Sequence, residues 1–582
     1  MRPALERQFT THDGSSLFYR HWPPTLAGPD ARALILLHRG HEHSGRLQHV
    51  VDGLGLDEFA VFAWDARGHG RSPGARGDSP GFAALVRDLD AFVAHLGETH
   101  GVAVGDIALI GQSVGAVIAA TWVHDYAPRL RCLVLTAPAF QVRLYVPLAR
   151  PGLALLRRLF GNFFITSYVK ARFLTHDPQR IASYDEDPLI TRNISARVLL
   201  ELGDAADRVV ADAQAIRVPL QLLISGNDWV VHRQPQERFF ERLGSPVREC
   251  HLLPGFLHDT LGERERRLPL NAIRAFVERM FAAPPAADSL LHADRDGYTR
   301  DEELRLGQPL PPFSPRRLNF AATRLAMRTL GRLGEGIAIG LASGFDSGSS
   351  LDHVYRNQAR GRLLLGRLID RGYLDSIGWR GIRIRRTHLL AAIASAAARL
   401  RAADQPIRVF DPAAGHGRYL VEAVQALPER PQSLLLRDLD ATNVAQARAL
   451  LDAAGLADIA HCETGDAFAE AELAALRPHP NLVTVSGLYE LFSDNQLVAA
   501  SLRGLAQAIE RGGYLIYTGQ PWHPQIELIA RTLTSHRGHQ PWIMRRRTQA
   551  EIDELVRVAG FSKLAQWIDD WGMFSVSLAR RD

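Results

Sequence analysis

Residues 107–123 read IALIGQSVGAVIAATWV, in which a Gly-x-Ser-x-Gly turn separates two apolar runs. The first run predicts a buried strand and the second a helix. Gly111 and Gly115 permit a sharp strand-to-helix turn, which projects the hydroxyl of Ser113 above the sheet. The stretch therefore predicts an exposed serine nucleophile at the carboxyl end of a strand in an α/β domain.

Short apolar runs of the same kind recur along the whole chain and alternate with helical patterns. Such strands predict parallel sheets covered by helices on both faces. They fall into two series, 33–37, 60–64, 107–111, 132–136 and 219–225, then 407–411, 433–437, 481–486, 513–518 and 573–579. The fold class is therefore α/β, with two separate sheets.

A proline-rich seam divides the two series of strands. It contains APPAAD at 283–288 and QPLPPFSP at 308–315, and proline stiffens a connection without forming a core. We expect a first domain over 1–282, a linker over 283–315, a helical preface over 316–400 and a second domain over 401–582. Within the seam, 292–303 copies the acidic spacing of a calcium loop but begins with histidine, and we expect a solvated loop there.

The composition argues against a nucleic-acid partner. The 582 residues carry a formal charge of +5, but all except two of the 68 basic residues are arginine, and acidic residues are interleaved throughout. No basic stripe of the kind that a duplex requires is evident. The N-terminal residues lack the apolar core of a signal peptide, and no apolar run is long enough to span a bilayer. We expect a cytoplasmic protein without a metal site.

Two further residues form, together with Ser113, the set of side chains that a serine hydrolase requires. Asp228 lies in ISGNDWVV, just beyond the strand 219–225, and His258 lies in LPGFLHDT, after another strand-like run. The order Ser, Asp, His is that of α/β-hydrolase triads. His258 would accept the serine proton, while Asp228 would orient the imidazole and stabilise its charged form. Asp259 is an alternative acid, although a neighbouring residue seldom reaches the ring beside it.

Residues 10–280 resemble the monoacylglycerol lipase and serine aminopeptidase branch of the α/β-hydrolases. The motifs on which this resemblance rests are HRGHEHSGR at 38–46, DARGHGRS at 65–72 and GQSVGA at 111–116. The resemblance implies an oxyanion hole formed by the backbone N–H groups of Gly40 and Val114. The chain departs from the family's HGxG pattern at Arg39 and His41, which puts the oxyanion geometry in doubt.

The region of about 139–218 has the place and length of a helical lid. Its apolar runs are accompanied by six basic residues and no acid between 140 and 175, namely Arg143, Arg150, Arg157, Arg158, Lys170 and Arg172. One interpretation is an amphipathic lid that packs on its own pocket. The other is an interfacial segment that makes peripheral contact with an anionic membrane surface.

In the second half, VFDPAAGHGRYL at 409–420 lies where the first strand meets the first helix. Gly415 and Gly417 would let the backbone approach a ligand closely. The strand 433–437 is followed by Asp438, which is suited to hold ribose hydroxyls, and Asp466 lies where an adenine-edge contact is expected. Asp440 competes with Asp438 for the ribose role, but Asp438 ends the strand directly.

These features resemble the class I S-adenosylmethionine-dependent methyltransferases, which have a Rossmann-like fold. The resemblance is clearest over 405–582, and SGLYELF with YTGQPWHP suggests a particular putative-methyltransferase family. It implies S-adenosylmethionine as cofactor, with Asp411, Gly415 and Gly417 at the methionine end, Asp438 at the ribose and Asp466 at the adenine. A nicotinamide site is disfavoured because Leu420 replaces the third glycine of GxGxxG.

The sequence thus predicts a bifunctional enzyme. A serine hydrolase would cleave a small-molecule or lipid ester, such as an acylglycerol or lysophospholipid-like compound, and a methyltransferase would act on an acceptor that the sequence does not identify. The acceptor could bind near Tyr489, Glu490, Trp522 or His523, each of which could equally be a packing residue. The alternative is a peripheral membrane or scaffolding protein with a degenerate hydrolase half and an adenosine-ligand sensor.

Overall fold

The computed structural model describes residues 1–26, 32–284 and 288–582. The chain divides into two compact units, Met1–Asp288 and Ser289–Asp582, each with a sheet of its own. The unit boundary falls within the stretch 283–315, of which residues 285–287 lie outside the described part. Within the described residues, no helix is both long and apolar enough to cross a membrane.

The first unit is built on an eight-stranded sheet in the order β1-β2-β4-β3-β5-β6-β9-β10. β2 is antiparallel to β1 and β4, and every later pairing is parallel. The strands are β1 (Leu5–Thr10), β2 (Ser16–Trp22), β3 (Ala33–Leu37), β4 (Ala60–Trp64), β5 (Ile107–Gln112), β6 (Cys132–Thr136), β9 (Leu220–Ser225) and β10 (Arg248–Leu253). This is the α/β-hydrolase architecture, and it confirms the predicted fold class.

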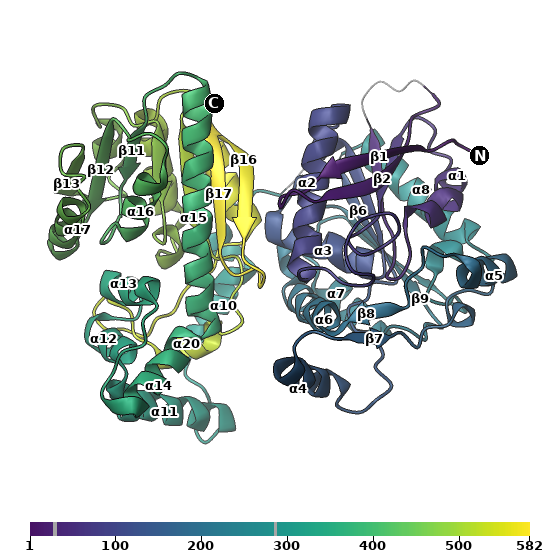
Figure 1. The fold of residues 1–582 in the computed structure, drawn as a ribbon, viewed down its shortest axis with the longest axis horizontal. Helices are drawn as coiled ribbons and strands as arrows, with labels where there is room; N and C mark the ends of the chain where they lie inside the picture. Colours follow the sequence, from purple (N-terminus) through teal and green to yellow (C-terminus); the bar gives the residue numbers. More distant parts are fainter. Residues whose placement is uncertain (27–31, 285–287) are drawn as a thin grey trace. The chain divides into compact units, whose positions relative to one another are not determined.

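Helices cover both faces of this sheet, as its fully apolar central strands require. They are α1 (Gln48–Leu54), α2 (Phe82–His100), α3 (Val114–Tyr126), α7 (Arg233–Arg242) and α8 (Arg267–Ala282). Figure 1 shows α1 and α8 on one side of the strands and α2 and α3 on the other. On the α1 and α8 side, Val51 and Phe276 pack with Leu34 and Val134 of the sheet in one buried cluster.

Between β6 and β9 the chain leaves the sheet and forms the lid segment, residues 139–218. A two-stranded antiparallel ribbon joins its parts. Its elements are α4 (Ala149–Phe160), β7 (Phe164–Thr166), α5 (Pro178–Glu186), β8 (Asn193–Ser195) and α6 (Ala196–Ala211). The side chain of Ser195 caps α6 by accepting from the N–H of Val198, which fixes the point where the ribbon becomes a helix.

The second unit contains a seven-stranded sheet in the order β13-β12-β11-β14-β15-β17-β16. All pairings are parallel except those of β17, which runs antiparallel to β15 and β16. The strands are β11 (Arg408–Asp411), β12 (Ser433–Asp438), β13 (Ala460–Thr464), β14 (Leu482–Val485), β15 (Tyr514–Gly519), β16 (Phe561–Ile568) and β17 (Ser575–Arg581).

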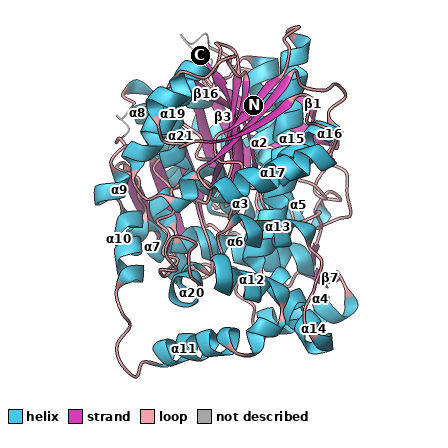
Figure 2. Cartoon of the chain, turned by 90° about the vertical axis from the view of Figure 1, so that its left-hand side faces the viewer, coloured by secondary structure: helices cyan, strands magenta, loops and turns pink. Residues whose placement is uncertain are grey.

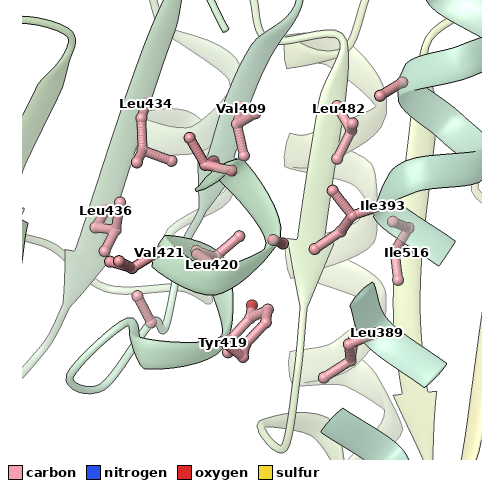
Figure 3. Close-up of a cluster of buried hydrophobic side chains, with 14 of the residues drawn as sticks. Leu389, Ile393, Val409, Tyr419, Leu420, Val421, Leu434, Leu436, Leu482 and Ile516 are labelled. Carbon is pink, nitrogen blue, oxygen red and sulfur yellow. The ribbon is translucent and has the colours of Figure 1, made fainter. Parts of the chain in front are cut away.

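Helices of the preface and of the strand connections complete the second unit. They are α11 (Pro315–Arg328), α12 (Glu335–Ser343), α13 (Gly348–Arg356), α14 (Leu363–Leu374), α15 (Ile377–Ala402), α16 (Arg418–Ala426), α17 (Ala441–Ala453), α18 (Glu470–Ala474), α19 (Asn495–Ala508), α20 (Ile526–Thr532) and α21 (Gln549–Val558). Figure 3 shows Leu389 and Ile393 of α15 among residues of the strands and of α16. By contrast, α11, α12 and α14 lie to one side of the strands (Figures 1 and 2).

The prediction of a solvated loop at 292–303 is wrong. This stretch forms α9 (Ala293–Asp296) and α10 (Tyr298–Gly307), and its carboxylates bind residues elsewhere in the second unit. Asp294 accepts from the N–H of Asn495 at 3.0 Å, and Glu302 accepts from Nε of Arg546 at 2.6 Å. The acidic residues therefore serve as partners for buried polar groups, a role that their spacing alone does not reveal.

Candidate active sites

Ser113 occupies the turn between β5 and α3 in a strained backbone conformation, with φ 55° and ψ −114°. A Cβ at Gly111 would lie 2.7 Å from Cα of Ala116, and one at Gly115 would lie 2.6 Å from the carbonyl oxygen of His38. Both neighbours are backbone atoms, so neither glycine can be replaced without moving the turn. The Gly-x-Ser-x-Gly pattern is thus required by close packing on both sides of the serine.

The structure brings together the three residues that the sequence suggested. Nε2 of His258 is 2.8 Å from Oγ of Ser113, and Nδ1 of His258 is 2.7 Å from Oδ2 of Asp228. All three side chains are buried. Since Ser113 follows β5, Asp228 follows β9 and His258 follows β10, the carboxyl edge of one parallel sheet positions the whole hydrogen-bonded chain.

The second oxygen of Asp228 is also held. Oδ1 accepts from the N–H groups of Val230 at 2.7 Å and Val231 at 3.0 Å. Burial alone would raise the pKa of Asp228, but His258 and the two N–H groups outweigh it and leave the pKa below its ordinary value. The carboxylate is therefore ionised and fixed in orientation at neutral pH.

Asp259, the alternative acid, points to a different set of partners. Its Oδ1 accepts from Nε2 of Gln112 at 3.0 Å, and its Oδ2 lies 2.8 Å from Nη2 of Arg180. Burial would raise its pKa, but Arg180 and Arg39 lower the pKa well below the ordinary value. Asp259 thus serves a buried ionic cluster, and Asp228 is the acid that contacts the imidazole.

The loop that carries Gly40 lies against Val114. A Cβ at Gly40 would be 3.1 Å from Cγ2 of Val114, so the two residues proposed for the oxyanion hole are neighbours. Val114 is the first residue of α3, where a backbone N–H has no partner within the helix. His41 adopts φ 70°, the left-handed region in which the family pattern has glycine. Burial lowers the pKa of His41 to about 4, so this imidazole is neutral.

Arg39, the other departure from the family pattern, belongs to a buried ionic cluster. Its Nη2 is 2.7 Å from Oε1 of Glu42, and its guanidinium lies over the ring of Tyr184 at 5.3 Å. Glu42 also accepts from Nε of Arg46 at 2.8 Å. The sequence analysis did not find this cluster, although HRGHEHSGR contains three of its members at helical spacing.

The lid segment exposes a large part of its apolar surface. Helix α4 has no buried residue. Large apolar side chains are exposed on the helix and at the residue just before it, namely Leu148, Leu155, Leu156, Leu159 and Phe160. Its arginines are less available than the sequence implied. Arg150 is 2.6 Å from both Asp204 and Asp207, and Arg157 is 2.9 Å from Glu201, all on α6.

The glycine-rich turn of the second unit has the backbone geometry of a ligand loop. Gly415 has φ 57°, and a Cβ there would meet nothing within 4 Å, so its face is open. Gly417, with φ 69°, precedes the first residue of α16, and a Cβ there would be 2.4 Å from Cδ2 of Leu436. One glycine thus faces open space, while the other lets the helix begin close to the sheet.

The three acidic candidates lie at one edge of the same sheet. Asp411 ends β11, Asp438 ends β12 and Asp466 follows β13, and these strands are parallel neighbours. Asp438 Oδ2 accepts from the N–H of Gly415 at 2.9 Å, which ties the carboxylate directly to the glycine-rich turn. Asp440 instead caps α17 by accepting from the N–H of Thr442, which leaves Asp438 facing the turn.

Asp411 is the most perturbed of these carboxyl groups. It is fully buried, accepts from the hydroxyl of Tyr419, and accepts from the N–H of Ala413 at 2.8 Å. Burial is the largest influence and raises the pKa of Asp411 to about 7, despite the opposing hydrogen bonds. Open space at Gly415 and carboxylates at successive strand ends fit a ligand with ribose hydroxyls and a positive charge.

The four acceptor candidates separate in the structure. Tyr489 is buried, with its hydroxyl 2.9 Å from Oγ of Ser501, and the guanidinium of Arg546 lies 5.5 Å from the ring of Trp522. These two residues pack or support their surroundings. Glu490 and His523 line a cavity of about 280 Å³. Arg385 of the preface lines it too, a residue for which the sequence offered no signal.

Comparison with known proteins identifies the two halves. Residues 273–581 match the family described as "Putative methyltransferase", and residues 28–265 match the family described as "Serine aminopeptidase, S33". The protein YnbC of Escherichia coli (strain K12) is 53% identical over 579 residues, which cover 99% of this chain and 98% of YnbC. The monoacylglycerol lipase of Mycolicibacterium smegmatis is 26% identical over 285 residues, 47% of this chain and 96% of the lipase.

Solved structures similar to the chain include the monoacylglycerol lipase of Paleococcus ferrophilus, with 22% identity and a TM-score of 0.40, covering 48% of this chain and 99% of that one. A soluble variant of the monoglyceride lipase of Saccharomyces cerevisiae has 19% identity and a TM-score of 0.43, covering 48% and 96%. The family matches confirm both resemblances drawn from the sequence motifs.

Proposed function

Since the chain belongs to the methyltransferase family whose pattern residues 273–581 match, and its other half matches a serine hydrolase family, we propose that it is a bifunctional enzyme. We assign hydrolysis to residues 1–282 and methyl transfer to residues 401–582 with the preface 316–400. The observation that carries the hydrolase assignment is the pair of short contacts joining Ser113, His258 and Asp228.

In the proposed hydrolytic step, His258 Nε2 removes the proton from Ser113 as its Oγ attacks the ester carbonyl. Asp228 holds the Nδ1 proton and stabilises the imidazolium, a role supported by its buried, ionised carboxylate. The N–H groups of Gly40 and Val114 would then stabilise the developing oxyanion. His258 returns the proton to the leaving alcohol, and water releases the acyl group by the reverse sequence.

The proposed substrate is an ester of an acylglycerol or a lysophospholipid-like compound. This proposal rests on the relatives of the first half, which include a monoacylglycerol lipase and a protein described as a phospholipase, YtpA of Bacillus subtilis (strain 168). The exposed apolar side chains of α4 support it, because they offer apolar surface to a substrate with a long acyl chain.

Labelling with a fluorophosphonate probe tests the nucleophile. The native chain should be labelled at Ser113, and Ser113→Ala should lose both the label and the esterase activity. Ser183→Ala, at an exposed serine of α5, is the matched control and should be labelled as the native chain is. A folded native protein that takes no label would exclude the serine mechanism and favour a degenerate hydrolase half.

For the second half we propose an S-adenosylmethionine-dependent methyltransferase. Asp411, Gly415 and Gly417 would line the methionine end, Asp438 would hold the ribose hydroxyls and Asp466 would contact the adenine edge. When bound, this cofactor supplies an electrophilic methyl group on a positively charged sulfur. The chain's part is to align the acceptor with that methyl group and to exclude water.

Titration calorimetry with S-adenosylmethionine tests this assignment. The native chain should bind the cofactor, and Asp438→Ala should weaken binding by about tenfold or more, since charge-assisted hydrogen bonds to the ribose are lost. Asp458→Ala, an exposed aspartate outside the strand ends, is the control and should leave binding unchanged. Preference for a nicotinamide dinucleotide, or no binding, would overturn the assignment.

We further propose peripheral contact between α4 and an anionic membrane surface, by a protein that resides in the cytoplasm. The exposed leucines of α4 support contact with acyl chains. The cytoplasmic location is supported by the three free cysteines of the chain, Cys132, Cys250 and Cys462, which suit a reducing compartment. Leu159→Asp should reduce sedimentation with vesicles of anionic phospholipid. Leu268→Asp, at a comparably exposed leucine of α8, should not. Equal binding by both variants would contradict the proposal.

A further inference from the structure

The second unit contains a cavity of about 280 Å³ between its preface and the carboxyl ends of its strands. The volume is large compared with the roughly 10–15 Å³ of such space that a cavity needs to hold one water molecule. The cavity is distinct from the glycine-rich turn, because neither Gly415 nor any of the three strand-end aspartates contributes to its lining. It is therefore a separate space beside the proposed cofactor site.

The walls of this cavity are mainly apolar and aromatic. The preface contributes Ile337, Leu351, Trp379 and Ile382, and the C-terminal part contributes Leu528, Ile529, Trp542, Met544 and Phe574. Such walls favour a ligand with an apolar body, because burying apolar surface is the main source of its binding free energy. Aromatic rings on both sides also favour a flat ligand.

Five polar atoms of lining residues have no hydrogen-bond partner among the described residues, and two of them are the hydroxyl of Tyr373 and Nε1 of Trp542. The other three belong to residues at or across the ends of β14 and β15. They are Nε of Arg385, Oε2 of Glu490 and Nε2 of Gln520. The side chains of Arg385 and Glu490 are only 5% and 8% exposed, and Gln520 is 7% exposed. Buried polar groups without partners are costly, so a ligand that satisfies these atoms would gain affinity and selectivity.

The other carboxylate oxygen of Glu490 is already occupied, which fixes what its free oxygen can do. Oε1 of Glu490 accepts from the hydroxyl of Thr518 at 2.6 Å and is 3.6 Å from Nη1 of Arg385. The charges of Arg385 and Glu490 therefore balance each other, and the three side chains of Arg385, Glu490 and Gln520 offer two free donors and one free acceptor.

The position of the polar atoms connects the cavity to the proposed cofactor site. Glu490 follows β14 and Gln520 follows β15, two neighbouring strands of the edge that also carries Asp411. A Cβ at Gly487 would lie 3.2 Å from Nη2 of Arg385, so the arginine crosses the end of β14. Burial and the neighbouring Asp411 raise the pKa of Tyr419, an effect that Arg385 opposes, and Tyr419 donates to Asp411.

The free atoms select among head groups by elementary hydrogen-bond chemistry. A carboxylate can accept from Arg385 and Gln520 but cannot donate to Glu490, whose free oxygen would repel it. An ammonium group can donate to Glu490 but cannot accept from the two donors. A hydroxyl group can do both at once, because it carries one donor and two lone pairs.

We propose that this cavity is the acceptor site of the methyltransferase half and that it takes a neutral, largely apolar molecule bearing a hydroxyl group. The hydroxyl donates to Oε2 of Glu490 and accepts from Arg385 or Gln520. On methylation, an oxygen lone pair forms the new C–O bond, the electrons of the S–C bond remain on sulfur, and the hydroxyl proton passes to Glu490. This inference rests on the proposed methyltransferase function.

Calorimetry on the full chain without cofactor tests the site with three ligands that share one ring system. The ligands are 2-naphthol, 2-naphthoate and 2-naphthylmethylammonium at pH 7. We expect 2-naphthol to bind most tightly, by about tenfold or more over either ion, because each ion leaves one buried group unsatisfied. Equal binding of all three, or a preference for either ion, would overturn the head-group assignment.

Three variants locate the binding. Glu490→Gln should weaken 2-naphthol about tenfold and strengthen 2-naphthoate, because an amide places a donor where the carboxylate oxygen was. Leu528→Trp should abolish binding of all three ligands by filling the cavity from its partly exposed wall. Glu527→Gln is the matched control, since this residue of α20 pairs with Arg316 outside the lining, and it should bind as the native chain does. Unchanged binding in Leu528→Trp would place the ligand elsewhere.

S-adenosylmethionine titrations on the same samples separate this inference from the function on which it rests. Retained cofactor binding by Leu528→Trp shows that this variant is folded and that the two sites are distinct. A native chain that binds 2-naphthol selectively but not the cofactor would overturn the methyltransferase assignment. A chain that binds the cofactor but none of the three ligands would overturn the acceptor site alone.

Discussion

Nη2 of Arg39 lies 2.7 Å from Oε1 of Glu42, three residues further along the loop that carries Gly40. This contact turns the long side chain of Arg39 toward Glu42 and the ring of Tyr184. Arg180, whose Nη2 is 3.8 Å from Glu42, joins the lid segment to the same cluster. One of the two residues that depart from the family's glycine pattern is therefore part of the contact between the loop that carries Gly40 and residues 139–218.

Replacement of Arg39 by alanine should destabilise the first unit. The change leaves Glu42 with Arg46 and Arg180 as partners but removes its shortest contact and the packing on Tyr184. We expect a loss of about 1–3 kcal/mol in the free energy of unfolding, measured by urea denaturation. Arg274→Ala, which breaks an exposed pair with Glu278, should cost less than about 0.5 kcal/mol. Equal losses of unfolding free energy in the two variants would show that the buried cluster stabilises the first unit no more than an exposed ion pair does.

Asp228 and Asp259 should have separable roles. Asp228→Asn should lower esterase kcat by about 10⁴-fold, because an amide favours the wrong imidazole tautomer. Asp259→Asn should reduce stability by weakening the contact with Arg180, while retaining most of the activity. Steady-state kinetics and denaturation of both variants provide the measurement. The reverse pattern of activity would make Asp259 the acid of the triad.

The pKa of Asp411, raised by burial to about 7, predicts a pH-dependent stability of the second unit. Between about pH 4 and pH 7 the folded chain holds a proton that the unfolded chain releases, so this group makes stability fall as pH rises. Asp411→Asn removes that dependence. The free energy of unfolding of the variant minus that of the native chain should therefore rise by on the order of 3 kcal/mol between pH 4.5 and pH 8.

Thermal or urea unfolding of both proteins at the two pH values measures this difference. The comparison cancels the titration of all other groups, since only residue 411 changes. A constant difference between native chain and variant across this range would show that Asp411 ionises normally in the folded state.

Arg545 should anchor helix α10 to the rest of the second unit. Its side chain is fully buried, and it donates to Glu551 at 2.6 Å, to Asn495 at 2.9 Å and to Thr299 of α10 at 2.9 Å. Arg545→Ala leaves Glu551 buried with weaker partners, which should cost about 3–5 kcal/mol.

Hydrogen exchange of the amides in 298–307 should also accelerate in Arg545→Ala. Arg305→Ala changes a side chain that is 75% exposed and should leave both the unfolding free energy and the exchange rates as in the native chain. Slow exchange that persists in Arg545→Ala would show that other contacts hold α10.

Local sequence patterns predicted the frame of both sites. Short apolar runs mark the strands, and the residues just beyond their carboxyl ends are the ones that meet at a parallel sheet edge. Ser113, Asp228 and His258 could be found in this way because each follows its strand within a few residues. The glycines of both turns were found because tight turns and close backbone approach leave few alternatives to glycine.

Charge balance could not be predicted in this way. The basic stretch of the lid contains no acid in sequence, yet Arg150 and Arg157 are paired with α6, which begins more than 30 residues further along the chain. The acidic residues between 294 and 303 were predicted to lie in a solvated loop, but they bind buried groups elsewhere in the second unit. Ion pairs depend on which surfaces meet, and this information is absent from a local pattern.

The sequence by itself determined the two α/β folds, the placement of Ser113 and His258 just beyond strand ends, and the glycine-rich turn, because these depend on apolar periodicity and on short-range backbone geometry. Only the tertiary structure decided which acid serves His258, how Arg39 is accommodated and which polar atoms line the cavity of the second unit. Arg385 shows the reason most clearly. It is more than 100 residues from both Glu490 and Gln520, and only folding of the preface onto the sheet edge brings the three into one cavity.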